Sequence, residues 1–311
     1  MEKVSILIPV YNSEKTIVDL CKCLMEMFSG YQDFQVVLVN DGSHDNSGKL
    51  CRQLCDDYPE ILTYVELARN FGEHNALMAG LNHVAGDYCV IMDDDFQNPP
   101  EAVKKLTDEI RKGYDVVYTY YEERNYPLFR RLGSYFNDRV ANIVLKKPRG
   151  LYLSSFKCIN RFLVNELIKY DGQDPYLDGI ILRSTDRIGK VCVEQHARRA
   201  GKSGYTIRKL LSLWTSMLLN FSLIPLRVIG ILGVLLSLCS VAYSIHQRFF
   251  DPPFDPLTDT ELIVVLLLFL IGLVFLGIAL LAEYIGRMYL FMNKQPQYVV
   301  RETVTRRKLT S

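Results

Sequence analysis

The sequence predicts an α/β protein with a doubly wound, mostly parallel sheet in its N-terminal part and membrane helices in its C-terminal part. Over residues 1–120, short segments rich in Val, Ile and Tyr alternate with longer segments of helical periodicity. This alternation is typical of parallel strands joined by helices. Farther along, the 21 residues from Leu262 to Ala282 carry no charge. A helix of that length spans the hydrocarbon core of a bilayer.

The expected strands and helices follow one another in order through the first 120 residues. The strand segments are apolar and bounded by turn residues: Val4–Pro9, Val36–Asn40, Leu62–Leu67, Tyr88–Met92 and Val116–Tyr120. The helical segments have apolar residues at a period near 3.6: Glu14–Phe28, Ser47–Asp57, Asn75–Ala85 and Pro100–Lys112. Ligands of such sheets gather at the carboxyl ends of the strands, which is where the polar motifs of this sequence fall.

The C-terminal third is predicted to contain three membrane-associated helices. Residues 206–222 have apolar side chains at helical spacing opposite polar ones, with Trp214 among them, which favours an amphipathic helix lying in the interface. Pro225 follows this helix, and the two apolar runs Val228–Ile245 and Leu262–Ala282 then predict a pair of membrane-spanning helices.

Charge predicts the orientation of these spans. The loop 246–261 between them carries four acidic residues and one Arg, whereas six Lys or Arg residues follow Glu283. By the positive-inside rule the loop is external and both termini are cytoplasmic. The expected units are a cytoplasmic domain (1–205), an interfacial helix (206–222), a transmembrane hairpin (223–288) and a basic cytoplasmic tail (289–311).

Composition excludes several classes of function. With 36 Lys and Arg against 35 Asp and Glu, the net charge is +1, so no basic field favours nucleic acid. The eight cysteines form no C-x-x-C pair, and we interpret them as reduced thiols in the cytosol. Neither a G-x-G-x-x-G after the first strand nor a P-loop motif occurs, which argues against a dinucleotide-dependent dehydrogenase and a P-loop NTPase.

Three consecutive carboxylates, Asp93, Asp94 and Asp95, follow an expected strand. Alternation along a strand puts Asp93 and Asp95 on one face and Asp94 on the other. Their mutual repulsion is relieved by a hard cation such as Mg²⁺ or Mn²⁺, which one or two carboxylates hold while phosphate oxygens fill the remaining positions. Because Tyr11 and Asp41 end neighbouring strands, the sequence predicts a site for a metal and a phosphorylated ligand at this edge.

Several motifs together resemble those of family 2 glycosyltransferases with the GT-A fold. They are VSILIPVYN, VLVNDGS, LARNFGEHNALMAGLNHVAGD and IMDDDFQNPPE. Within the family, the chain is similar to the polyisoprenyl-phosphate glycosyltransferases, which include dolichyl-phosphate mannose synthase and bacterial undecaprenyl-phosphate glucosyl- and aminoarabinosyltransferases. The resemblance extends through Arg198-x-x-Gly201-x-Ser203-x-Tyr205, Pro225-Leu226-Arg227 and the Glu283–Arg287 segment.

The resemblance implies roles for individual residues. Those expected to bind the donor are Pro9, Tyr11, Glu14, Asp41, Asp94 and Gln97. The metal would be held by Asp93 and Asp95, and the groups expected to act in catalysis are Asp95, Arg124, Arg131 and Arg198. The acceptor phosphate would meet Arg124, Arg131, Arg198, Lys202, Ser203 and Tyr205.

The implied reaction is the inverting transfer of a hexose from a nucleotide-diphosphate sugar, a UDP-sugar, to a polyprenyl phosphate. For undecaprenyl phosphate, this places an integral protein in the inner (cytoplasmic) membrane, with cell-envelope glycans as the destination of the sugar. Mg²⁺ or Mn²⁺ is the implied cofactor, and a homo-oligomer such as a tetramer is the implied assembly.

The chain departs from the family pattern at Ser13, where an acidic residue is common, at Gly204, where a lysine is usual, and at Ser155, where some relatives have an aspartate. A phosphate acceptor is already unprotonated on one oxygen at neutral pH, because its second pKa is about 6. We therefore expect no general base at Ser155, and Ser155→Ala should retain most activity.

Two alternatives stay open. A processive polysaccharide synthase generally has more spans and a Q/R-x-x-R-W signature, and the segment before the single Trp, Trp214, does not match it. A membrane scaffold that binds a nucleotide sugar without catalysis would not need the Asp93 and Asp95 pair.

Overall fold

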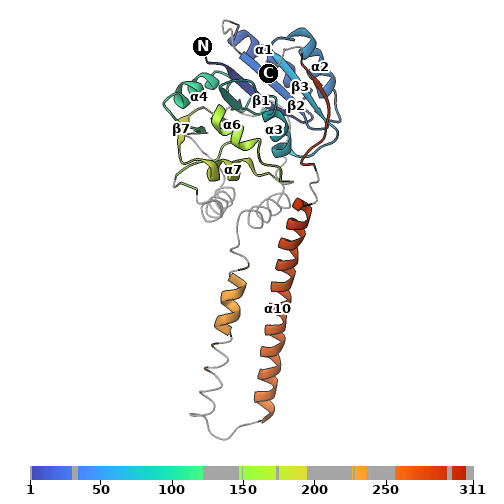
Figure 1. Cartoon of the computed structure of the whole chain (residues 1–311), viewed down its shortest axis with the longest axis vertical. Helices are drawn as coiled ribbons and strands as arrows, with labels where there is room; N and C mark the ends of the chain where they lie inside the picture. Colours follow the sequence, from blue (N-terminus) through green and yellow to red (C-terminus); the bar gives the residue numbers. More distant parts are fainter. Residues whose placement is uncertain are drawn as a thin grey trace. The chain divides into compact units, whose positions relative to one another are not determined.

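The chain separates into two compact units, residues 1–205 with 295–311 and residues 206–294. The computed structural model describes residues 2–29, 34–121, 147–148, 150–172, 175–194, 256–292 and 296–305, together with 226, 228–236, 238 and 242. The first unit contains an eight-stranded sheet (Figure 1), and the second contains a long apolar helix.

The N-terminal elements follow the predicted order closely. They are β1 (Val4–Val10), α1 (Ile17–Met27), β2 (Phe34–Asn40), α2 (Ser47–Asp57), β3 (Leu62–Leu67), α3 (Glu73–Leu81), β4 (Tyr88–Ile91), α4 (Ala102–Ile110) and β5 (Val116–Tyr120). After β5 the described elements are β6 (Lys157–Asn160), α6 (Arg161–Leu167), α7 (Leu177–Ser184) and β7 (Ile188–Cys192), and β8 (Val300–Val304) lies near the C-terminus.

The sheet is mixed, with the order β7-β5-β6-β4-β1-β2-β3-β8. Strands β1 to β4 pair in parallel, as predicted, and β5 pairs in parallel with β7. Strand β6 is antiparallel to both β4 and β5, and β8 is antiparallel to β3. The prediction of a mostly parallel sheet therefore holds for β1 to β4 and for the β5–β7 pair, whereas β6 and β8 make the sheet mixed. The four-residue segment of β6 is too short for its periodicity to predict a strand between β4 and β5.

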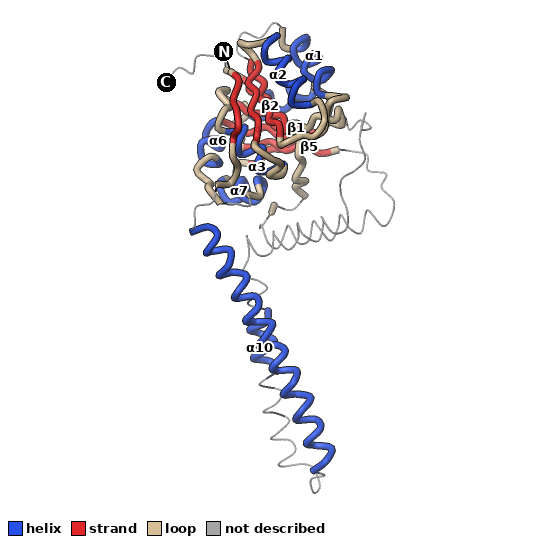
Figure 2. Tube along the Cα trace, turned by 90° about the vertical axis from the view of Figure 1, so that its right-hand side faces the viewer, coloured by secondary structure: helices blue, strands red, loops and turns tan. Residues whose placement is uncertain are grey.

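Helices cover both faces of the sheet (Figure 2), because successive strand residues point to opposite sides. Ile6 and Ile8 of β1 lie in one apolar cluster with residues of α1, α2 and α4. Leu7 lies in the other cluster with residues of α3, α6 and α7. Every residue of β2 is buried, as expected for a central strand covered on both faces.

Strand β8 adds the C-terminal segment to the edge of the sheet that β3 would otherwise leave open. Tyr64 pairs with Val304, Glu66 with Glu302 and Leu67 with Val300, so the register skips one residue of β8. A bulge of this kind turns the following side chains to the other face. Val304 consequently packs against one apolar cluster and Val300 against the other.

Helix α10 runs from Pro256 to Met292 in the second unit. Among the residues that the structure describes, it is the one helix long and apolar enough to cross a membrane, over Phe269–Gly286, where no residue is buried. It contains the predicted span Leu262–Ala282 and also residues 256–261, which the sequence analysis assigned to the external loop. Of the other predicted span, residues 228–236 are helical and most of the rest lies outside the described residues.

Two other predicted segments compare differently with the structure. The interfacial helix at 206–222 lies entirely outside the described residues. The segment 289–311 was predicted as a separate tail, whereas α10 continues to Met292 and residues 300–304 form β8. The segment Val300–Val304 has two charged residues and a threonine between its two valines, and so short a segment becomes a strand only when a sheet edge is available to pair with it.

Close packing of α3 on the sheet generates a stability prediction. A Cβ on Gly80 would lie 2.2 Å from Leu7 Cδ1 and 2.8 Å from Val39 Cγ2. Overpacking of this kind costs about 1–3 kcal/mol, so Gly80→Val should lower the thermal unfolding midpoint of the purified chain by about 2–10 °C. Ala85→Val is the matched control because Ala85 is exposed. Equal midpoints for the two variants would contradict this packing.

Candidate active site

The loops after β1 and β2 are joined at the carboxyl edge of the sheet. The Asn12 N–H donates to Ser43 Oγ at 3.0 Å, and Asn12 Oδ1 accepts from the His44 N–H at 2.9 Å. Asn12 has a φ of 55°, a left-handed conformation that asparagine tolerates better than most residues. Tyr11, next to it, is 46% exposed, so its ring is available to a ligand while its backbone is fixed.

Glu14 and Asp45 reinforce the same junction. Glu14 Oε2 accepts from the backbone N–H of Asn46 at 3.2 Å and from its Nδ2 at 3.1 Å. Asp45 Oδ2 accepts from the Glu14 N–H at 3.1 Å, and Asp45 Oδ1 accepts from Ser47. Glu14 was predicted to bind the donor, and in the structure its carboxylate holds the start of α2.

Asp41 ties the loop after β2 to the loop after β3. Its buried carboxylate accepts from the Phe71 N–H at 2.7 Å and from the Gly72 N–H at 2.9 Å. Burial raises the pKa of Asp41, and the two backbone hydrogen bonds oppose that shift. At Gly42, which has a φ of 64°, a Cβ would lie 2.5 Å from backbone atoms of Arg69 and Asn70, so only glycine permits this close approach.

The three consecutive carboxylates follow β4, and hydroxyl or backbone donors contact each of them. Ser155 Oγ donates to Asp93 Oδ2 at 2.6 Å, and Ser13 Oγ donates to Asp94 Oδ2. Asp95 Oδ1 accepts from the Gln97 N–H at 3.0 Å. Hydrogen bonds to a carboxylate favour its charged form and fix its direction.

Phe96 sets the direction of the chain between Asp95 and Gln97. Its φ is 59°, which is strained for a residue with a Cβ and is typical of functional sites. The Phe96 ring is only 8% exposed and belongs to the apolar cluster with α4. Burial of this ring holds the turn in place, and the turn presents the carboxylates at the edge of the sheet.

The electrostatics of this edge suit a divalent cation. Burial is the first cause that raises the pKa of Asp94 to about 7, and the charges of Asp93 and Asp95 add to it. Loss of surrounding water, with the charge of Asp93, raises the pKa of Glu73 at the start of α3 to about 7. A bound cation would favour the charged form of both carboxyls and so offset the cost of their burial and of the neighbouring negative charges.

The described residues contain no group of three or more His, Cys, Asp or Glu side chains arranged to hold a metal ion. Mg²⁺ and Mn²⁺ sites that bind diphosphates commonly use one or two protein carboxylates, with phosphate oxygens and water as the other ligands. Asp93 and Asp95 fit such a donor set, because both follow β4 directly and carry the negative charge that a divalent cation would neutralise.

A second polar cluster lies beside the first and includes a buried ion pair. Lys157 of β6 donates to Asp178 of α7, and both side chains are almost fully buried. The Tyr118 hydroxyl donates to the same Asp178 oxygen at 2.9 Å. His74 packs edge-on against Tyr176, with 5.3 Å between the ring centroids. Burial lowers the pKa of His74 to about 4, and its Nδ1 has no hydrogen-bond partner among the described residues. His74 is therefore neutral near pH 7.

The structure brings together part of the predicted site. Tyr11, Glu14, Asp41 and the Asp93–Gln97 segment lie on loops at the carboxyl edge, and Pro9 lies in β1 beside Val39 of β2. The expected acceptor-phosphate residues Arg124, Arg131, Arg198, Lys202, Ser203 and Tyr205 lie outside the described residues. Their roles stay predictions.

Two contacts at the site were missed by the sequence analysis. Ser13 and Ser155 are positions at which the chain departs from the family pattern, and their hydroxyls donate to Asp94 and Asp93. Sequence separations of 81 and 62 residues conceal both contacts. The available signal for Ser13 was its place in the motif that ends the first strand, directly before Glu14. Ser155 had no signal other than its position two residues before β6.

The contact between Ser155 and Asp93 generates a prediction about metal affinity. Groups that orient a metal ligand commonly contribute about 10–100-fold to affinity. Ser155→Ala should therefore weaken Mn²⁺ binding about tenfold or more, measured by electron paramagnetic resonance in the presence of saturating UDP, while turnover at saturating Mn²⁺ stays close to native. Ser29→Ala, which removes a hydroxyl at the end of α1, should bind Mn²⁺ as the native chain does. Native affinity in Ser155→Ala would contradict the orienting role.

Comparison with known proteins places this geometry in a family. Residues 5–167 match the model described as "Glycosyl transferase family 2". The chain is 31% identical over 319 residues to the undecaprenyl-phosphate 4-deoxy-4-formamido-L-arabinose transferase of Yersinia pestis (strain Pestoides F), covering 98% of this chain and 94% of that protein. The protein of the same name from Yersinia enterocolitica has the same identity and coverage.

Solved structures of the same fold include glucosyl-3-phosphoglycerate synthase from Mycobacterium tuberculosis. Its complex with UDP superposes with a TM-score of 0.53 at 18% identity, over 71% of this chain and 79% of that one. Its complex with Mn²⁺ and UDP-glucose gives 0.52 at 16% identity, over 70% and 77%. This likeness concerns the fold alone. The family model and the Yersinia relatives show that the chain belongs to glycosyl transferase family 2.

Proposed function

We propose that this glycosyltransferase moves one sugar from a nucleotide-diphosphate sugar, a UDP-sugar, to the phosphate of a polyprenyl phosphate such as undecaprenyl phosphate. The observation that carries the proposal is the strand-end carboxylate pair, Asp93 and Asp95, beside the linked loops that carry Tyr11 and Asp41. The named activity of the Yersinia relatives, which match almost the whole chain, supports the lipid phosphate as acceptor.

The proposal covers two classes of donor sugar, a hexose and a pentose. Sequence analysis favours a hexose, whereas the sugar in the name of the Yersinia relatives is an L-arabinose derivative, which is a pentose. Discrimination between such donors depends on a few hydrogen bonds to hydroxyl groups. A donor panel for this protein should therefore include both classes.

A single inverting displacement fits the residues. The acceptor phosphate supplies an unprotonated oxygen at neutral pH, so no side chain has to remove a proton. Mg²⁺ or Mn²⁺ held by Asp93 and Asp95 would stabilise the charge that develops on the leaving diphosphate. Ser155 and Ser13 orient the carboxylates, and Arg124, Arg131 and Arg198 are proposed to screen the repulsion between the two anionic substrates.

We also propose the topology of an integral membrane protein with both termini in the cytoplasm. The chain leaves the catalytic unit before residue 206 and returns to it at 295, and β8 pairs with β3. A chain that returns to the same folded unit must cross a membrane an even number of times. If α10 supplies one crossing, a second must lie within residues 206–255, where Val228–Ile245 is the apolar candidate.

The activity test uses the purified full chain with undecaprenyl phosphate, Mn²⁺ and a panel of UDP- and GDP-sugars, with lipid products identified by mass spectrometry. The expected product is one sugar per lipid phosphate, and EDTA should abolish its formation. Asp95→Asn should lower turnover by roughly 10²-fold or more, comparable to removal of one transition-state stabiliser. Turnover near the native rate in Asp95→Asn would contradict the metal assignment.

The same assay separates the alternatives. A processive synthase would release polymer, and a non-catalytic scaffold would bind nucleotide without turnover. Either result would overturn the proposed single transfer.

The topology can be tested by labelling introduced cysteines in a background without reactive native thiols. A cysteine at position 255 should react with an impermeant maleimide on intact cells, because the proposed loop is external. A cysteine at 307, after β8, should react only when the membrane is permeabilised. Labelling of position 307 on intact cells would place the C-terminal segment outside the cell, together with the sheet to which β8 is paired, and would overturn the cytoplasmic assignment.

A further inference from the structure

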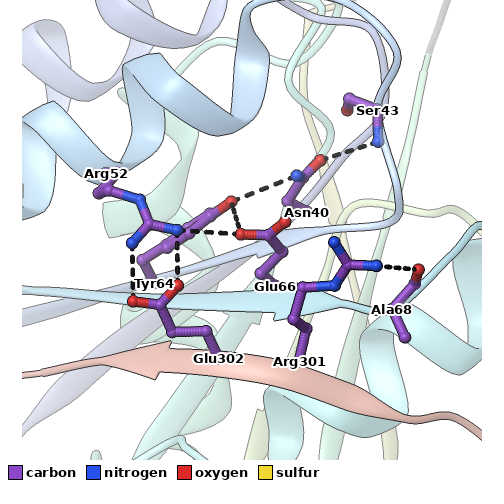
Figure 3. Close-up of polar contacts among 8 residues, drawn as sticks. All are labelled: Asn40, Ser43, Arg52, Tyr64, Glu66, Ala68, Arg301 and Glu302. Carbon is purple, nitrogen blue, oxygen red and sulfur yellow. Dashed lines mark hydrogen bonds and ion pairs between the residues drawn. The ribbon is translucent and has the colours of Figure 1, made fainter.

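The C-terminal strand is attached to the sheet through a pair of facing carboxylates. Glu302 of β8 lies directly opposite Glu66 of β3, an arrangement that is destabilising when like charges have no counterion. Arg52 of α2 supplies it: its Nη1 and Nη2 donate to the two Glu302 oxygens at 2.7 and 2.6 Å, and Nη2 also donates to Glu66 at 3.1 Å (Figure 3). The guanidinium thus holds two strands and a helix together.

The same network continues into the interior of the domain. The Tyr64 hydroxyl donates to Glu66 Oε2 at 3.4 Å. The oxygen of the same Tyr64 hydroxyl accepts from Asn40 Nδ2 at 3.2 Å (Figure 3). Tyr64 is fully buried and Asn40 is 4% exposed. Buried polar groups depend on their partners, because water cannot replace a lost hydrogen bond.

Asn40 ends β2 and closes the loop that begins with Asp41. Its Oδ1 accepts from the Ser43 N–H at 3.1 Å, while Ser43 Oγ accepts from the Asn12 N–H. One amide side chain therefore connects the Glu302 network to the loops after both β1 and β2. In the proposed function, which this inference presupposes, these loops hold the donor nucleotide.

We propose that Arg52 and Glu302 are positioning residues for the donor nucleotide, acting through Tyr64 and Asn40 on the loop 41–43. Glu302 lies on the strand that follows α10, so the segment returning from the apolar helix completes the support of this loop. The hydrogen bonds from Arg52, and then its charge, lower the pKa of Glu302, and the pair stays ionised near neutral pH. The role is distinct from catalysis, because neither side chain reaches the strand-end carboxylates.

The test measures UDP binding by calorimetry and the kinetic constants for donor and lipid in the full-length protein. Glu302→Ala should weaken UDP binding and raise the donor KM by about three- to tenfold, while kcat at saturating donor and the lipid KM stay within about twofold of native values. Tyr64→Phe removes the hydroxyl that links Asn40 to Glu66 and should have the same effect. A purely structural defect would instead lower the amount of active protein, and hence kcat, without selecting the donor KM.

A double-mutant cycle tests the path itself. If the effect of Glu302 passes through Tyr64, the combined variant Glu302→Ala with Tyr64→Phe should bind UDP no more weakly than the weaker single variant. Multiplying effects would show independent routes and overturn the proposed path. The exchange Arg52→Glu with Glu302→Arg keeps a cation between two carboxylates and should restore binding relative to either single change.

Controls distinguish this inference from the proposed function. Glu166 of α6 forms an exposed ion pair with Lys169, so Glu166→Ala should leave UDP binding and the kinetic constants unchanged. If Glu302→Ala does not fold, Glu302→Gln keeps a hydrogen-bond acceptor and should raise the donor KM in the same direction. Native UDP affinity in the folded Glu302 and Tyr64 variants would overturn this inference and leave the proposed function intact. No UDP binding by the native chain would overturn the UDP-sugar function and, with it, this inference.

Discussion

Repulsion among three consecutive carboxylates at the end of β4 is the constraint on which the candidate site depends. Asp93, Asp94 and Asp95 cannot all stay ionised and close together without hydrogen bonds and a counterion. Burial raises the pKa of Asp94, and the charges of Asp93 and Asp95 raise it further. The fold answers with donors from distant parts of the chain, Ser13 after β1 and Ser155 before β6. The strained turn at Phe96 is held by burial of its ring in the core. The remaining negative charge makes the edge suitable for a divalent cation, and such a cation can in turn bind phosphate oxygens.

A second constraint is the pairing of β8 with β3. The sheet edge at β3 would expose unpaired backbone groups if β8 were absent, and such edges are prone to pairing with other chains. The C-terminal segment covers this edge after the long apolar helix, so the same strand completes the sheet and limits how the chain can cross a membrane. Because Glu302 faces Glu66, this pairing also requires Arg52, which connects the strand to α2. One guanidinium thus contacts both β3 and β8 and joins the network that reaches the loop after β2.

Buried polar side chains hold the loops of the candidate site in place. Asp41 uses both carboxylate oxygens to hold backbone N–H groups of the loop after β3, and Asn40 closes the neighbouring turn. Lys157, Tyr118 and Asp178 form a buried group between β5, β6 and α7. Such networks stabilise one arrangement because an unpaired member would cost more than the contact contributes. Rigid loops of this kind let exposed groups such as Tyr11 meet a ligand without further ordering.

The elements from β1 to β5, the strand-end position of the carboxylates and the family could be predicted from the sequence, because these depend on local periodicity and on motifs of contiguous residues. The sequence also predicted a long apolar helix, which the structure describes as α10. The antiparallel placement of β6, the return of β8 to the sheet, and the contacts of Ser13 and Ser155 with the carboxylates became visible in the folded structure alone. Short strands such as β6 and β8 have too little periodicity to be recognised before a partner edge exists. Hydrogen bonds between residues many positions apart depend on how the strands pair, which is a property of the folded sheet and has no local signal in the chain.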